Sequence, residues 1–516
     1  MRKRIFLLLF LLCLAMLTAC SDMDDDGPST PDSPPQSDGP LVEPIPTPAG
    51  LVEFSLPYFT GETMDPVTCA DGPHQAIGAL LYEGLYALDE CFEPQPMLAK
   101  SFTYDAETLV YGVTLRSGVT FSDGTPLTSD DVAATLERAR WSARYGGRLS
   151  DVTSVNAAED TVYIALSRPN ASFIARLDIP IVKSGTENDP VPVGTGRYVW
   201  QEENGAAFLT VNEHNWRSEK LPIHRIALVP CKDMDAMAYA FFSRKVQLVV
   251  WDLTGTVPFN ASGANSYTDV PTAVMQYVGF NTGSRLFSNP ALRSALSLGI
   301  DRENCVSACL LGHGEAAAFP VSPSSRLYPA SLERRWSSAD FAAAMAEAGY
   351  DTGIEHPVTM IVSAGNAFRV GMAQQIAERL SAYDVKITVK ALPWGEFQQA
   401  LTVGNYDLYY AECKLPSDWD LSALLAENGA LNFSHYTDEE LPELLYAAAT
   451  SSGGRREVAL RSLYVHLQEK APFVPVCFKN VSVLLPQKAV ELQTPTAADP
   501  FFGLADWAIL WADAES

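Results

Sequence analysis

Strand-like and helix-like segments alternate along two stretches of the chain, and this alternation constrains the fold most. In residues 207–254 a helical pattern lies between strand candidates, and residues 338–415 repeat this order. The strand candidates are Phe208–Asn212, Ile223–Val229, Val246–Trp251, Val358–Val362, Val385–Lys390 and Tyr406–Glu412. Strands that alternate with helices favour parallel sheets covered by helices, so we expect an α/β protein.

The stretch Leu115–Ala139 combines the end of a strand, a turn and a helix. Asp123-Gly124 supplies the turn, because glycine adopts positive φ without a Cβ clash. Thr128 suits a helix N-cap, and Asp131 three residues later can complete a capping box. The apolar positions of the expected helix are Val132, Leu136 and Ala139. From the residues alone, we expect a packing unit without chemistry.

The same stretch resembles the signature region of the extracellular solute-binding proteins of peptide and nickel ABC importers (the oligopeptide- and dipeptide-binding type, bacterial solute-binding family 5). Further resemblances lie at Gly194–Tyr198, at Val278–Thr282 and at Gly299–Arg302. The resemblance extends over nearly all of residues 50–512. The matching positions of the first motif are Leu115-Arg116, Gly118, Phe121, Asp123–Thr128, Asp131-Val132 and Arg138-Ala139.

The resemblance implies a two-lobe fold like that of periplasmic binding proteins, with an extra inserted domain. The chain would cross a hinge between the lobes twice, which suits closure of the lobes on a ligand. The implied parts are lobe I (residues 51–75, 192–280 and 485–516), the inserted domain (residues 76–191) and lobe II (residues 281–484).

The N-terminus predicts export. Basic residues at positions 2–4 precede an apolar run, residues 5–17, that is too short for a comfortable spanning helix. The run leads to Leu17-Thr18-Ala19-Cys20, which resembles a lipoprotein lipobox. We therefore interpret residues 1–20 as a lipoprotein signal peptide whose Cys20 receives the lipid. An ordinary secretory peptide or an uncleaved anchor would export the chain as well.

Composition narrows the choice of partners. Residues 21–50 are rich in proline and aspartate, and we expect them to form a disordered tether. We expect the protein to be exported and held by lipid at the outer face of the cell membrane, or to lie in the periplasm. The formal net charge is −26 and no basic stripe is present, which argues against a nucleic-acid partner. We expect a monomer.

Seven cysteines follow Cys20, so at least one thiol stays unpaired within a monomer. Cys305 and Cys309 lie four residues apart on an expected helix, and His313 follows four residues later. This spacing could offer half of a metal site. Because Gly312 would end the helix before His313, we favour a role in the core. We expect no metal and no cofactor.

The main candidate site is Lys414–Leu421, a loop directly after the last strand candidate. Ligands of α/β proteins tend to bind at such loops. In peptide-binding members of the family an aspartate here pairs with the α-amino group of the ligand, and the resemblance assigns this role to Asp418, with Trp419 and Asp420 beside it. The family's usual proline after the second acid is replaced by leucine. Alternatively, Asp418 or Asp420 only caps the next helix.

Three further residues are implied to bind ligand. Trp394 matches a family tryptophan that lines the cleft, with a core role as the alternative. Arg369 lies near the place where short-peptide binders hold the ligand's C-terminal carboxylate, a contact that suits a bidentate guanidinium. A surface role is the alternative for Arg369. Tyr277 is a weaker candidate, directly before the Val278–Thr282 motif.

No nucleophile elbow, Walker A motif or HExxH motif occurs, so we expect a binding protein and not an enzyme. The resemblance implies the substrate-binding lipoprotein of an ABC importer. It would capture peptides in an inter-lobe cleft and deliver them to a membrane permease, with the ATPase as a separate subunit. A nickel-chelate or oligosaccharide binder is the alternative within the family. A surface hydrolase or adhesin lipoprotein is the alternative from a different class.

Overall fold

The computed structural model describes residues 50–70, 72–257, 259, 264–351, 356–490 and 494–512. The expected signal peptide, its Cys20 and residues 21–49 of the expected tether lie outside these residues. In the part of the chain that the structure describes, no helix combines the length and the apolar character needed to cross a membrane.

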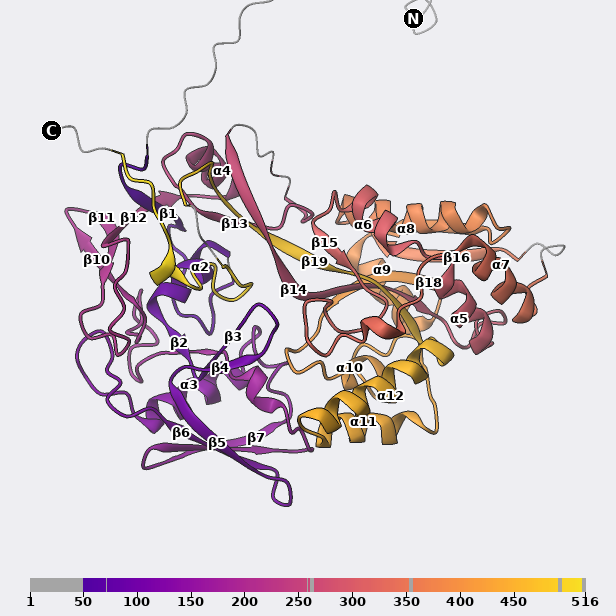
Figure 1. The fold of residues 1–516 in the computed structure, drawn as a ribbon, viewed down its shortest axis with the longest axis horizontal. Coiled ribbons are helices and arrows are strands. Elements are labelled where there is room, and N and C mark those ends of the chain that lie inside the picture. Colours follow the sequence, from indigo (N-terminus) through magenta and orange to yellow (C-terminus); the bar gives the residue numbers. More distant parts are fainter. Residues whose placement is uncertain are drawn as a thin grey trace, which may run out of the picture. The chain divides into compact units, whose positions relative to one another are not determined.

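Two long antiparallel strands, β14 (Asn265–Phe280) and β19 (Phe473–Pro486), run side by side through the structure (Figure 1). Their register shifts between Pro271 and Met275. On one side of this shift Val270 packs in a first hydrophobic core, and on the other side Met275 packs in a different core. Both strands therefore pass from one core into another.

The first core lies against a four-stranded sheet in the order β1-β12-β11-β10, in which only β1 and β12 are parallel. Helix α2 (Gly72–Leu81) adds Ile77 and Leu80 to this core. The strands are β1 (Phe54–Phe59), β10 (Tyr198–Glu203), β11 (Ala206–Val211) and β12 (Arg225–Cys231). The strands expected within residues 208–212 and 223–229 are confirmed.

The parallel arrangement suggested for residues 207–254 is wrong. Helix α4 (Met234–Phe242) does connect two strands, but β13 (Val249–Trp251) does not join β12 in one sheet. It pairs antiparallel with β19 instead. Both sides of β12 are already taken by β1 and β11, so no edge is free for β13.

A second core lies under an antiparallel sheet in the order β5-β6-β8-β7. Helix α3 (Ser129–Arg140) packs on this sheet and buries Val132 and Leu136. Its first turn has the expected capping box: Thr128 Oγ1 accepts from the backbone N–H of Asp131 (3.3 Å), and Asp131 Oδ2 accepts from that of Thr128 (2.9 Å). The elements around this core are β2 (Glu83–Gly84), β3 (Tyr86–Leu88), β4 (Pro94–Pro96), β5 (Ala99–Asp105), β6 (Val110–Leu115), β7 (Val152–Ala158), β8 (Thr161–Leu166), η1 (Phe173–Arg176) and β9 (Pro180–Ile181).

A third core covers both faces of a seven-stranded sheet, in the order β13-β19-β14-β18-β16-β17 with β15 on β19. Strand β16 is parallel to β17 and to β18, so the α/β order expected for residues 338–415 is confirmed. The remaining elements are α5 (Pro290–Leu298), α6 (Arg302–Cys309), β15 (Gly314–Ala316), η2 (Ala330–Leu332), α7 (Ser338–Glu347), β16 (Val358–Ser363), α8 (Ala367–Ser381), β17 (Ile387–Leu392), α9 (Trp394–Val403), β18 (Leu408–Lys414), α10 (Ser422–Leu425), α11 (Leu441–Thr450), α12 (Gly454–Lys470) and η3 (Leu504–Asp506).

The cysteine pair of α6 belongs to this third core. Cys305 is buried, and Cys309 packs partly buried against the same cluster. Helix α6 ends before His313, as Gly312 suggested, and His313 Nδ1 lies 3.0 Å from Asp269 Oδ2. The favoured core role is therefore confirmed for Cys305. The boundaries of lobe I, the inserted domain and lobe II stay a prediction.

Candidate functional site

A cavity of about 1370 Å³ lies where elements of all three cores meet. Its wall includes residues of α2 such as Gln75, residues after α3 such as Arg144 and Arg148, the crossing segment Val270–Val274, and part of the loop after β18. Pockets for drug-sized ligands measure roughly 300–1,000 Å³, so this cavity has room for a larger ligand together with water. It is far larger than the second cavity, of about 20 Å³, that lies beside Asp418 and Trp419.

Part of the loop after β18 lines this cavity, but the predicted site residues Asp418 and Trp419 do not. Lys414 ends β18, where it pairs with Val274 of β14, and Leu415 N–H donates to Ala273 O (2.8 Å). The sheet therefore fixes the start of the loop. Beyond it, Ser417 and Asp420 also line the cavity. The site thus lies at the carboxyl end of a strand in an α/β sheet.

Asp418 is buried and binds side chains from η1 and the segment before it. Its Oδ2 accepts from Arg176 Nε (2.7 Å) and from Asn170 Nδ2 (2.6 Å), and Arg176 is itself only 3% exposed. Among the described residues, Asp418 Oδ1 has no hydrogen-bond partner. A guanidinium of the chain itself thus occupies one side of the carboxylate that the family resemblance assigned to a ligand amine.

Asp420 takes part in the same network. It binds Arg168, and its Oδ2 accepts from Arg176 Nη2 (2.9 Å). Its Oδ1 accepts from the backbone N–H (3.0 Å) and the hydroxyl (2.6 Å) of Ser422, so it also supports the first turn of α10. Although burial opposes ionisation, Arg168 and Arg176 hold the pKa of Asp420 well below its usual value.

Trp419 is buried between these two acids, at a left-handed backbone φ of 55°. Its ring meets the edge of Phe92 at a centroid distance of 5.2 Å. It borders a second, much smaller cavity of about 20 Å³, together with Asp418. A bulky residue at positive φ is strained, and such strain is common near functional loops.

The three looser candidates lie outside the wall of the large cavity. Trp394 begins α9 and is 59% exposed. Arg369 Nη2 pairs with Glu412 Oε1 at 3.2 Å. Tyr277 is buried in the third core against Tyr409 and Phe473. The structure therefore does not bring these residues together with Lys414 and Asp420.

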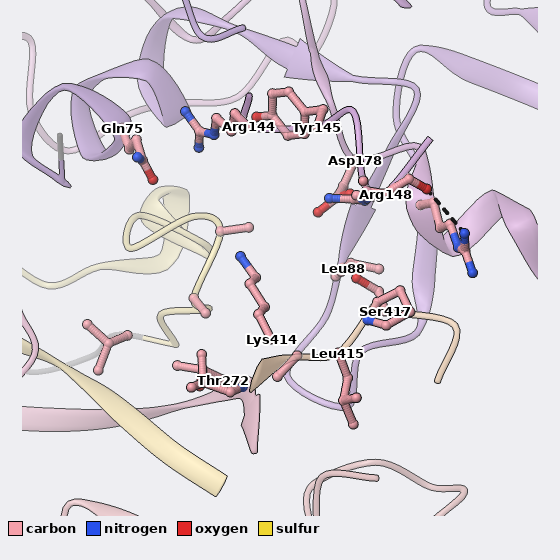
Figure 2. A pocket seen from close by; sticks show the side chains of 18 of the residues that line it. Gln75, Leu88, Arg144, Tyr145, Arg148, Asp178, Thr272, Lys414, Leu415 and Ser417 are labelled. Carbon is pink, nitrogen blue, oxygen red and sulfur yellow. Dashed lines mark hydrogen bonds and ion pairs between the residues drawn. The ribbon is translucent and has the colours of Figure 1, made fainter. Parts of the chain in front are cut away.

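The wall also contains cations that the sequence did not single out: Arg144, Arg148, Arg168 and Arg176. Figure 2 shows the side chains of Gln75, Arg144 and Lys414 pointing into the cavity, the first two from the wall opposite Lys414. The arginines follow α3 or precede β9, far from the loop after β18 in sequence. In the sequence, the only sign of these residues is that several arginines occur after the strand–turn–helix stretch Leu115–Ala139. Such a group of arginines does not by itself specify a binding site.

The chain resembles known solute-binding proteins. Residues 93–426 match the family model described as bacterial extracellular solute-binding proteins, family 5 Middle. The chain is 24% identical over 456 residues to the glutathione-binding protein GsiB of Escherichia coli K12, which covers 81% of this chain and 87% of the relative.

Solved structures share the fold at lower identity. The ABC transporter substrate-binding protein CtaP of Listeria monocytogenes is 20% identical with a TM-score of 0.71, covering 89% of this chain and 100% of its own. A nickel ABC transporter structure from Bacillus halodurans is 20% identical with a TM-score of 0.73, covering 87% of this chain and 97% of its own. These likenesses confirm the expected periplasmic-binding-protein-like fold.

Proposed function

Because the chain belongs to the bacterial extracellular solute-binding proteins of family 5, we propose that it binds short peptides in the large cavity and delivers them to the permease of an ABC importer. The observation that carries this proposal is the cavity of about 1370 Å³ between the loop after β18 and elements of the other two cores. A site shared by several cores can close and open as they move relative to each other.

Peptides fit this cavity in chemistry as well as in size. Its wall carries both basic side chains and acidic ones, such as Glu90 and Glu427, so it can hold a ligand with charges of both signs. Ordered water in a wide cavity can adapt to different side chains. The name of the relative GsiB makes glutathione, itself a short peptide, the first defined compound to test.

Native mass spectrometry of the protein purified from its host tests this proposal. We expect a mixture of co-purified peptides, or one short peptide, that is lost after unfolding and refolding. A nickel chelate or a sugar in place of peptide would contradict peptide binding and favour the nickel-chelate or oligosaccharide alternative. Turnover of the bound compound would assign the chain to the hydrolases instead.

The contact between Asp418 and the amine of a ligand remains a prediction. In this structure Arg176 already donates to the Asp418 carboxylate, so it would compete with a ligand amine. If Asp418 binds the ligand's ammonium group, Asp418→Ala lowers peptide affinity by about 2–5 kcal/mol, as found for other desolvated charge pairs. N-acetylated peptides give an independent measurement without changing the protein. Equal calorimetric affinity for acetylated and free peptides would show that Asp418 does not bind the ligand's amine and that its carboxylate keeps its contacts with Arg176 and Asn170 instead.

We also propose that the protein is a lipoprotein held at the outer face of the membrane through Cys20. The apolar run and the lipobox-like residues before Cys20 support this proposal. Acyl chains on one cysteine bury enough CH₂ groups to retain a folded domain at a membrane.

A further inference from the structure

In the part of the chain that the structure describes, Lys414 and Arg144 bring two positive charges to the cavity without a carboxylate partner. Among the described residues, the ammonium group of Lys414 has no hydrogen bond and no ion pair, and its side chain is exposed to the cavity. The guanidinium of Arg144 donates to the backbone carbonyls of Pro66 and Cys69 (both 3.1 Å), and its hydrogen bonds within the described residues reach no carboxylate. Figure 2 shows both side chains pointing into the same part of the cavity.

The nearby acids are engaged elsewhere, so they do not neutralise these charges. Asp178 pairs with Arg148, and Asp252 Oδ2 lies 2.5 Å from Lys479 Nζ. Asp151 binds Arg168 through two short contacts, 2.7 and 2.8 Å. Asp420 binds Arg168 and Arg176. The acids that remain on the wall, Asp89, Glu90 and Glu427, lie on the loops after β3 and α10.

The electrostatics of Lys414 agree with this arrangement. The surrounding protein lowers the pKa of Lys414 from its ordinary value by desolvation, and the positive charges of Arg148 and Arg144 lower it further. Like charges brought together in a protein repel each other, and a group of opposite charge placed between them offsets this repulsion. A carboxylate between Lys414 and Arg144 would relieve this repulsion and accept charge-assisted hydrogen bonds from both.

We propose that Lys414 and Arg144 form an anion site that holds a free carboxylate of the ligand, with the amide of Gln75 as a further donor. This inference rests on the proposed peptide-binding function and narrows it to peptides with an accessible carboxylate. Lys414 is fixed by the sheet of the third core, whereas Arg144 follows α3 of the second core. A carboxylate bound to both therefore connects two cores across the cavity.

A tryptone peptide pool, either untreated or methyl-esterified at its carboxylates, tests the site. Ligand-stripped protein is titrated with each pool, and the thermal shift and the bound masses are measured. We expect the untreated pool to stabilise the protein and the esterified pool to stabilise it far less. Lys414→Met should raise the pool concentration for a half-maximal shift by about tenfold to a hundredfold. Lys414→Arg should restore most of the binding, because it keeps the charge.

Lys390→Met is the matched control. Lys390 lies on β17, is exposed, and is outside the wall of the cavity, so this variant should bind both pools like the unmodified protein. Equal binding of the two pools, or unchanged binding by Lys414→Met, would overturn the anion site and leave peptide binding intact. If neither pool binds the unmodified protein, the proposed function fails and the anion site fails with it.

Discussion

Arg176 joins the loop after β18 to the second core through two carboxylates at once. Its Nε binds Asp418 and its Nη2 binds Asp420, from 242 and 244 residues away in sequence. Although burial lowers the pKa of Arg176, the charges of Asp418 and Asp420 raise it above its ordinary value. A buried arginine with several acidic partners stays charged, and its planar donors fix the loop.

The pH dependence of stability tests this network at Asp420. The folded-state pKa of Asp420 is lower than its unfolded value, so its stabilising contribution is complete above about pH 4 and is lost as the pH falls through the folded-state pKa. Asp420→Asn should lower the free energy of unfolding by about 2 kcal/mol at pH 7, the scale of hydrogen bonds to charged groups. The difference should shrink below pH 4. Urea unfolding from pH 2.5 to 7 measures it.

Glu53→Gln is the control for that series. Glu53 pairs with Arg225 at 3.0 Å, but both side chains are 52% exposed. Such a pair contributes less than about 1 kcal/mol, so this variant should stay near the unmodified protein at every pH. A loss of equal size for Asp420→Asn at pH 2.5 and at pH 7 would contradict an ionic role for Asp420.

At the level of elements, local patterns predicted much of the secondary structure. The expected strand Val358–Val362 corresponds to β16, and the helical pattern expected between the strands of residues 338–415 includes α8. Both were predictable because apolar periodicity and capping residues act over a few positions. Sheet membership was not predictable in this way. β13 pairs with β19 more than two hundred residues later, and no local pattern specifies that partner.

The candidate site was also predictable only in its local features. The sequence pointed to the loop Lys414–Leu421, since a loop after a strand of an α/β sheet is a local feature. It gave no sign that Arg144 and Lys414 point into the same cavity or that Arg176 binds Asp418, because the second core must pack beside the third to bring these residues near each other. Charge complementarity between distant segments therefore has to be read from the folded chain.

The capping box of α3 gives a prediction for a single element. Thr128→Ala removes the hydroxyl that accepts from Asp131 N–H, which should lower the free energy of unfolding by about 1 kcal/mol. Thr128→Ser keeps the acceptor and should differ little from the unmodified protein. Urea unfolding at pH 7 compares the three proteins. An equal loss for both variants would show that the methyl group of Thr128, and not the cap, is responsible.

For the molecule as a whole, the lipid attachment proposed for Cys20 would hold the binding domain at the membrane. We expect radiolabelled palmitate to be incorporated in a bacterial host, and Cys20→Ser to abolish the label and release the protein from the membrane fraction. Cys13→Ser, within the same N-terminal segment, should keep the label. Membrane retention without label, or label that persists in Cys20→Ser, would contradict the lipoprotein assignment.

In this proposal one cavity, shared by three cores, holds the ligand by its carboxylate. The most direct measurement is a crystal structure of the protein with the ligand that co-purifies from the host. We predict peptide density in the cavity, with a carboxylate oxygen within hydrogen-bond distance of both Lys414 Nζ and the Arg144 guanidinium. Density for a ligand elsewhere, or a ligand in the cavity whose carboxylates avoid both cations, would contradict it.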